Sequence, residues 1–207
     1  MPARKGLLID FGGVLTTNVF ESFAKFCEEE GLPPDHVASA FRSSPQPRQL
    51  LFDLELGKLP AEQFEQRFAA AIGVAADRAD GLATRMFAHS RADEAMIEAV
   101  RAAKAAGVRT GLISNSWGEA LAYDRDAFSE LFDAWVISHE VGLRKPDPEI
   151  YVLGAERIGL PPEECVFVDD LGGNLKPALE MGMATVRHRT ADETIPELEE
   201  LLGVSLR

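Results

Sequence analysis

Four short apolar runs in this chain each lead directly into a polar or acidic residue. Short runs rich in Val, Leu and Ile, bounded by Gly or charged residues, are typical of buried strands in a parallel sheet. Ligands bind at the carboxyl ends of the strands in such sheets. The side chains that follow the runs, although far apart in sequence, are therefore expected to converge. The runs are Gly6–Ile9, Val108–Ile113, Ala134–Ile137 and Cys165–Val168, and they lead into Asp10, Ser114, Ser138 and Asp169-Asp170.

The charge balance restricts the partners of this chain. Its 207 residues fit one α/β domain with an insertion, and they carry 34 acidic and 21 basic side chains, for a formal net charge of −13. Nucleic acids and anionic membranes bind clustered Lys and Arg, so this balance argues against both. A small anionic substrate would need local compensation from a metal ion and a few well-placed cations.

The sequence also bears on the cellular compartment. The first predicted strand follows the N-terminus directly, without the apolar segment and cleavage site of a secretory signal. No run reaches the roughly 18 apolar residues of a membrane span. Cys27 and Cys165 lack metal-binding spacing, so we expect two buried thiols. We expect a cytoplasmic protein, as a monomer or a homodimer.

Two kinds of pattern divide the chain. Between Thr17 and His89 only helical patterns occur, for example Phe64, Phe68 and Ile72 at helical spacing. Elsewhere predicted strands and helices alternate, which is typical of a doubly wound parallel sheet. The predicted fold class is α/β, with a Rossmann-like core formed by residues 1–16 and 90–207 and a small all-helical cap domain formed by residues 17–89.

Two carboxylate positions are the first candidates for chemistry. Asp10 precedes Gly12-Gly13, which allow a tight turn and a close approach of the backbone to a ligand. This carboxylate can attack a phosphoryl group, bind a metal ion or cap the turn. The adjacent carboxylates of Asp169 and Asp170 repel each other unless a cation neutralises them. They are candidates for Mg²⁺, which prefers oxygen ligands, or for a solvated cap of the next helix.

A hydroxyl and a lysine complete the set. Ser114-Asn115-Ser116 precedes a predicted helix and offers a hydroxyl and backbone N–H groups to an anion, although Ser and Asn are also ordinary helix caps. Lys145 is a cation in a loop that is stiffened by Pro146 and Pro148. Together these residues supply the nucleophile and the charge neutralisation that phosphoryl transfer requires.

The order and spacing of these residues resemble the haloacid dehalogenase superfamily over essentially the whole chain. The stretch of residues 17–89 resembles the helical cap that one subfamily carries after its first strand. Ser114–Trp117 and Asp169–Ala178 further resemble the phosphatase domain at the N-terminus of mammalian soluble epoxide hydrolase. The four motifs are Asp10–Leu15, Ile113–Asn115, Lys145-Pro146 and Val168–Asp170.

The resemblance implies a Mg²⁺-dependent phosphatase. Its substrate would be a small phosphate monoester of the sugar-, lipid- or acyl-phosphate type, hydrolysed through a phospho-aspartate on Asp10. The resemblance further implies that Asp10, Asp170 and the carbonyl of Gly12 hold Mg²⁺. Asp169 would support the metal directly or through water.

The resemblance also assigns residues to the phosphate. Ser114, Asn115 and Ser116 would bind phosphoryl oxygens. Lys145 would screen Asp10 from the incoming phosphate and stabilise the charge of the transition state. Trp117 would either stack on the organic part of the substrate or pack in the core.

One position departs from the family pattern. Phosphatases of this superfamily usually carry a second Asp two residues after the nucleophile, as general acid and base, and here that position is Gly12. Losing such a group typically costs about 10²–10⁴-fold in rate. The substrate could have a good leaving group, a nearby residue such as Thr16, Thr17 or His89 could substitute, or the chain could mainly bind its ligand.

Two other functions stay open. A metal-independent 2-haloacid dehalogenase also uses an Asp nucleophile without the second Asp, but the intact Asp169-Asp170 pair argues against it. A weakly catalytic phosphate-binding or phosphoryl-accepting module would also place an Asp, a hydroxyl and a Lys at strand ends. In receiver domains of that kind, however, the acidic pair comes first in the chain.

Overall fold

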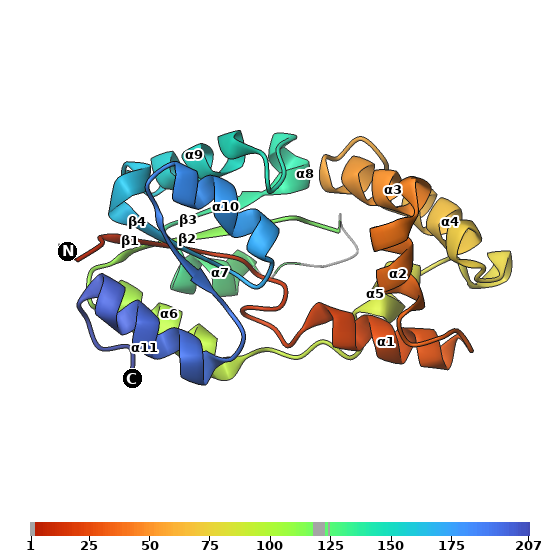
Figure 1. The fold of residues 1–207 in the computed structure, drawn as a ribbon, viewed down its shortest axis with the longest axis horizontal. Helices are drawn as coiled ribbons and strands as arrows, with labels where there is room; N and C mark the ends of the chain where they lie inside the picture. The colour runs from red at the N-terminus through yellow and green to blue at the C-terminus, as the bar shows by residue number, and fades with distance from the viewer. Residues whose placement is uncertain (1–2, 118–122, 124) are drawn as a thin grey trace.

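The computed structural model describes residues 3–117, 123 and 125–207. Among these residues, five parallel strands form one sheet in the order β3-β2-β1-β4-β5 (Figure 1). The chain order reverses at β1, which lies between β2 and β4. Ile9 of β1 pairs with Leu112 on one side and Val168 on the other. The strands are β1 (Gly6–Ile9), β2 (Arg109–Ser114), β3 (Ala134–Ile137), β4 (Cys165–Asp169) and β5 (Ala184–Arg187).

Helices cover both faces of the sheet, because its central strands are apolar on both sides. Leu7 and Ile9 point into one buried cluster and Leu8 into another, following the two-residue period of a strand. Helices α6 (Glu94–Ala105), α7 (Arg125–Leu131) and α11 (Ala191–Leu202) pack on the first face, and α9 (Pro148–Arg157) and α10 (Gly172–Glu180) on the second (Figure 1). The predicted α/β fold class is confirmed.

A second group of helices lies beyond the carboxyl ends of the strands, opposite the chain termini (Figure 1). These helices enclose an apolar cluster of their own, which includes Phe26, Phe64 and Phe68. The chain enters and leaves this group through neighbouring segments, where Thr16 bridges Ala92. The helices are α1 (Val19–Glu29), α2 (His36–Ser43), α3 (Pro45–Glu55), α4 (Ala61–Ile72) and α5 (Leu82–Met86).

Several predicted boundaries shift by a few residues. Strand β2 begins at Arg109 and includes Ser114, which therefore ends the strand instead of following it. Ser138 begins a short helix, α8 (Ser138–Val141), that the sequence did not predict. The start of the helix expected over residues 118–132 lies outside the described residues. None of the described helices has the length and hydrophobicity that a membrane span requires.

Candidate active site

Asp10 lies at the carboxyl end of the central strand. Its backbone N–H donates to the carbonyl of Val168 in β4 (2.9 Å), which extends the strand pairing by one residue. Its Oδ1 accepts a hydrogen bond from the N–H of Phe11 (2.7 Å). The turn that follows needs Gly13, because this residue has φ +77° and a Cβ there would lie 2.8 Å from Oδ2 of Asp170.

Three carboxylates converge at this point, as the sequence predicted. Asp10, Asp169 and Asp170 each offer one oxygen, and these oxygens all lie within 4.8 Å of one another. Asp169 is fully buried. It accepts hydrogen bonds from the N–H of Leu171 (2.8 Å) and from Nδ2 of Asn174 (3.0 and 3.1 Å). Asp169 is therefore held in place, whereas Asp10 and Asp170 also line a cavity.

Lys145 is the cation of the site. Its buried Nζ lies 2.7 Å from Oδ1 of Asp10 and 2.7 Å from Oδ2 of Asp169. The side chain of Asn115 fixes the lysine backbone, accepting from its N–H (2.8 Å) and donating to its carbonyl (3.0 Å). The amide side chain of Asn115 therefore positions the cation, a role that the sequence did not predict.

The site carries more negative charge than Lys145 balances. Burial, together with the carboxylates of Asp169 and Asp170, raises the pKa of Asp10 to about 8, against the opposing effect of Lys145. Burial and Asp169 raise the pKa of Asp170 to about 6. Burial alone would lower the pKa of Lys145, but the carboxylates of Asp10 and Asp169 raise it above its usual value. A further cation at this place would favour the ionised carboxylates.

The segment after β2 places its side chains in different surroundings. Ser114 lines the cavity, with its hydroxyl 3.1 Å from the hydroxyl of Tyr123. Ser116 is fully buried and is not among the cavity-lining residues. Its N–H donates to Oγ of Ser138 (2.9 Å), and its hydroxyl lies 2.8 Å from Nδ1 of His139.

Trp117 both packs in a core and lines the cavity. Its ring makes edge or tilted contacts with four phenylalanine rings of the cap helices and the segment after them, at centroid distances of 5.2 to 5.9 Å. Packing in the core and contact with the organic part of a substrate, the two roles considered for Trp117, are therefore compatible. The rings belong to Phe23, Phe41, Phe64 and Phe87.

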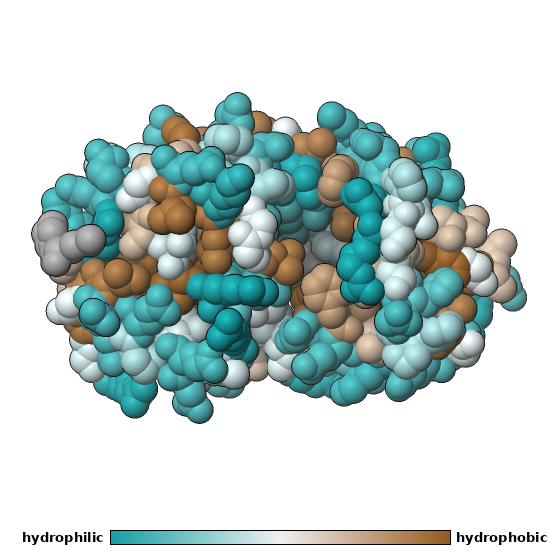
Figure 2. All heavy atoms as spheres, viewed as in Figure 1, coloured by the Kyte–Doolittle hydropathy of each residue, from teal (hydrophilic) through white to brown (hydrophobic). Residues whose placement is uncertain are grey.

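The cavity has a volume of about 260 Å³ and lies between the sheet and the cap helices. Figure 2 shows the hollow between these two parts from one side, with apolar residues along it. The end at the sheet is polar, and the wall from the cap is mostly apolar, with Glu55 as a charged exception. The polar end is lined by Asp10, Ser114, Asn115, Lys145, Asp170 and Asn174, and the apolar wall by Val19, Phe20, Phe23, Phe41, Leu51, Phe87 and Trp117.

A family model described as haloacid dehalogenase-like hydrolase matches residues 4–182. The chain belongs to this family. It is 37% identical to bifunctional epoxide hydrolase 2 of Sus scrofa over 118 residues, which are 54% of this chain and 21% of that protein. The chain thus matches about a fifth of the length of the epoxide hydrolases.

Two phosphatases are further relatives of this haloacid dehalogenase-like hydrolase. The glyceraldehyde 3-phosphate phosphatase of Methanopyrus kandleri is 34% identical over 116 residues, covering 49% of this chain and 48% of that protein. The hexitol phosphatase A of Escherichia coli is 26% identical over 201 residues, covering 95% and 88%.

Solved structures share the fold. A predicted HAD-like hydrolase from Porphyromonas gingivalis has a TM-score of 0.72 at 22% identity, covering 96% of this chain and 98% of that one. A HAD family enzyme from Bacteroides thetaiotaomicron has a TM-score of 0.68 at 20% identity, covering 90% and 94%. The predicted family and the predicted hydrolase class are confirmed.

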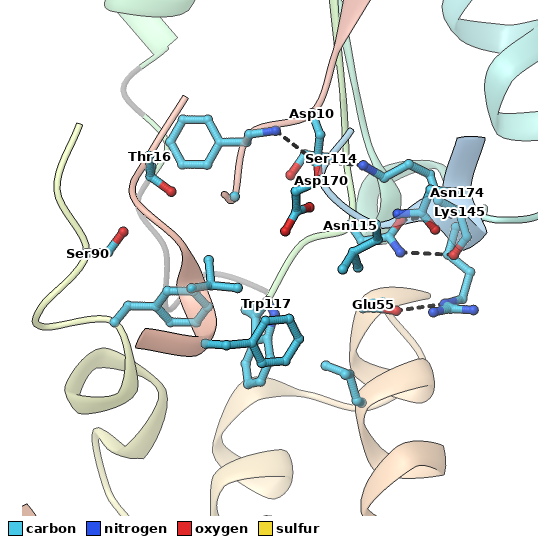
Figure 3. A pocket seen from close by; sticks show the side chains of 18 of the residues that line it. Asp10, Thr16, Glu55, Ser90, Ser114, Asn115, Trp117, Lys145, Asp170 and Asn174 are labelled. Carbon is cyan, nitrogen blue, oxygen red and sulfur yellow. Dashed lines mark hydrogen bonds and ion pairs between the residues drawn. The ribbon is translucent and has the colours of Figure 1, made fainter. Parts of the chain in front are cut away.

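Two charged cavity residues of this hydrolase were not predicted from the sequence. Glu55, at the end of α3, forms an ion pair of 2.7 Å with Arg144, which precedes the lysine of the site (Figure 3). The guanidinium of Arg144 also lies 3.8 Å from the ring centroid of Phe52. Burial raises the pKa of Glu55, and Arg144 opposes that shift. The pair joins segments 89 residues apart, which no local pattern reveals.

The three residues considered as substitutes for the missing second Asp differ in position. Thr16 lines the cavity, and its hydroxyl accepts a hydrogen bond from the N–H of Gly13 (3.0 Å). Thr17 and His89 are not among the lining residues, and His89 is paired with Glu29 at 2.7 Å. Gly12 itself lines the cavity.

Proposed function

We propose that this chain is a Mg²⁺-dependent phosphatase that forms a phospho-aspartate on Asp10 and acts on phosphate esters with a small, uncharged, apolar organic group. The observation that carries the proposal is the position of the Asp10 carboxylate. It lies between Lys145 and two further carboxylates, at the polar end of a cavity whose opposite wall is mostly apolar.

The donor set fits Mg²⁺. Three carboxylates supply oxygen ligands, which this ion prefers, and they carry more charge than Lys145 neutralises. Asp10, Asp170 and the carbonyl of Gly12 would hold the ion, with Asp169 as a direct or water-mediated support. When bound, Mg²⁺ neutralises charge on the carboxylates and on the phosphoryl oxygens.

Each residue of the site then has a separate role in the reaction. Asp10 attacks phosphorus, an oxygen–phosphorus bond forms, and the bond from phosphorus to the leaving oxygen breaks. Lys145 orients Asp10 and stabilises negative charge in the transition state, and the hydroxyl of Ser114 donates to a phosphoryl oxygen. Water then attacks the phosphorus of phospho-Asp10, which releases phosphate and restores the carboxylate.

The residues of the cavity wall favour a substrate with an apolar organic group. Phe20 and Leu171, which line the cavity, are also exposed (39% and 45%), so its rim is apolar as well. Arg144 is neutralised by Glu55 and offers no free charge to a second anionic group. Apolar walls with few polar anchors bind apolar ligands, which favours aryl and acyl phosphates over sugar phosphates.

A substrate panel tests this proposal. Phosphate release is measured from an aryl phosphate, a series of acyl and alkyl phosphates of rising chain length, and sugar 1-phosphates, with Mg²⁺ or with EDTA. We expect Mg²⁺-dependent turnover and a rise in kcat/KM of about fourfold for each methylene that the cavity buries. No turnover on any of these phosphates with Mg²⁺ would refute the phosphatase, and a preference for sugar phosphates would refute the apolar substrate. Metal-independent chloride release from 2-chloropropionate would instead indicate a dehalogenase.

Restoring the second Asp is expected to help poor leaving groups selectively. A Cβ at Gly12 would meet only Cγ1 of the partly exposed Val19, at 3.3 Å, so Gly12→Asp requires a small shift. We expect kcat on alkyl phosphates to rise about 10²-fold, and kcat on a nitrophenyl phosphate, whose leaving group needs no protonation, to rise less, through base catalysis of the second step alone. Gly12→Asn, which has the same shape and cannot act as an acid, should show no gain. Equal rates for the wild type and Gly12→Asp on alkyl phosphates would mean that another group already supplies the proton.

Mg²⁺ is expected to change how stability depends on pH. In the metal-free folded protein Asp10 has a pKa of about 8, whereas the pKa of an Asp in an unfolded chain is about 4. Between these values the folded chain binds a proton that the unfolded chain does not, so the free energy of unfolding falls as pH rises. Denaturant unfolding at about pH 5 and about pH 8 should therefore show a larger stabilisation by Mg²⁺ at the higher pH. Equal stabilisation at both pH values would contradict a shared carboxylate site.

A further inference from the structure

The hydroxyl of Tyr123 is placed at the phosphate end of the cavity, next to Ser114. The two oxygens are 3.1 Å apart, and both residues line the cavity. The tyrosine ring is packed edge-on against Phe11 (centroid distance 5.3 Å) and tilted against Phe128 (5.5 Å). This packing fixes the ring, so the direction of its hydroxyl does not depend on the hydrogen bond to Ser114.

Tyr123 belongs to a chain of neighbouring polar groups. The side chain of Ser116 also acts on this hydroxyl, in the direction that lowers the pKa of the phenol. The hydroxyl of Ser116 lies 2.8 Å from Nδ1 of His139 in α8. His139, Ser116, Tyr123 and Ser114 thus follow one another from α8 to the polar end of the cavity, and the N–H of Ser116 is anchored on Ser138 (2.9 Å).

The hydroxyl of Ser114 has a single proton, so a second donor beside it decides where that proton points. A serine hydroxyl has one proton, and it helps a phosphoryl transfer only when that proton points at a phosphoryl oxygen. If Tyr123 donates its proton to Oγ of Ser114, the serine proton remains available for the phosphate. Burial raises the pKa of Tyr123 above its usual value, which keeps the phenol protonated and able to donate.

We propose that Tyr123 is a positioning residue that orients the hydroxyl of Ser114 toward the transferred phosphoryl group, with Ser116 and His139 behind it. The proposal rests on the phosphatase function proposed above. Donors in a row polarise one another, so each member strengthens the hydrogen bond made by the next. Tyr123 acts through Ser114, so removal of its hydroxyl should lower activity only when the serine hydroxyl is present.

A double-mutant cycle tests this dependence. Tyr123→Phe removes only the hydroxyl and keeps the ring contacts, and Ser114→Ala removes the group on which it acts. We expect Tyr123→Phe to lower kcat on an aryl phosphate about tenfold with little change in KM, as for the loss of one hydrogen bond. In the Ser114→Ala background the same substitution should cost less than about twofold. Equal losses in both backgrounds would refute the proposal, because they would show that Tyr123 acts independently of Ser114.

A second variant and a binding measurement extend the test. Ser116→Ala, which interrupts the chain one step further away, should give a smaller loss that also vanishes in the Ser114→Ala background. The same cycles are measured on the affinity for inorganic phosphate with Mg²⁺ present. Coupling in phosphate affinity without any turnover would refute the phosphatase but retain the role of Tyr123. Turnover without coupling in either measurement would refute the role of Tyr123 alone.

Discussion

Asp10→Asn is expected to abolish phosphate release while the protein remains folded. The amide has the shape of the carboxylate but cannot attack phosphorus, and loss of a covalent nucleophile costs about 10⁴-fold or more in turnover. The substitution also removes one of three clustered carboxylates, two of which, Asp10 and Asp169, contact the same lysine. The metal-free protein should therefore become more stable, not less, in denaturant unfolding at neutral pH.

The combination of the two results separates chemistry from folding. Asp77→Asn is the matched control, because Asp77 is exposed and lies away from the cavity. It should change neither turnover nor stability. Substantial turnover in Asp10→Asn would exclude this residue as the nucleophile. A loss of stability in Asp10→Asn would show that the charge of the Asp10 carboxylate is already compensated in the metal-free protein.

Lys145→Met is expected to damage both activity and stability. Lys145 is 1% exposed, and its Nζ contacts two carboxylates at 2.7 Å each. Removing one partner from a buried ionic group leaves uncompensated charge and costs about 3–5 kcal/mol in the free energy of unfolding. Turnover should fall about 10²-fold or more, because Asp10 loses its orientation and the transition state loses a cation.

Mg²⁺ should partly restore the stability of Lys145→Met, since the ion supplies positive charge to the same carboxylates. The matched control is Lys176→Met, because Lys176 is highly exposed on α10 and makes a weak ion pair, at 3.9 Å from Glu180. Unfolding curves for both variants, with Mg²⁺ and with EDTA, give the comparison. A stability of Lys145→Met equal to that of the wild type in EDTA would contradict the charge balance inferred for the site.

The convergence of the acidic residues could be predicted because it follows from backbone periodicity. Buried strands in a parallel sheet place their carboxyl ends along one edge, so the residue that follows Ile9 must lie beside the residue that follows Val168. Ser114 could be predicted for the same reason, whereas Lys145 lies in the loop after α8 and was predicted from its neighbouring prolines and the family motif. The assignment of these residues as catalytic stays a prediction until turnover is measured, as does the division of the chain at residues 17 and 89.

The rest of the site depends on tertiary contacts that leave no local pattern. Ser138 was predicted as a strand end, but its hydroxyl donates to the carbonyl of Glu55 (2.6 Å) and so joins the short helix α8 to α3. Asn115 was predicted to bind phosphate through its backbone, and no sequence pattern indicated that its side chain holds the lysine backbone. Glu55 and Tyr123 stood in no recognised motif. These roles appear only when segments distant in sequence are brought together.

Acid-quench mass spectrometry of the protein during turnover of an aryl phosphate with Mg²⁺ tests the phospho-aspartate on Asp10 most directly. We expect the peptide containing Asp10 to gain the mass of one phosphoryl group. The adduct should be lost on incubation at alkaline pH, as an acyl phosphate is, and it should be absent from Asp10→Asn. Rapid turnover without any adduct on this peptide, or an adduct that persists in Asp10→Asn, would contradict a phospho-aspartate on Asp10.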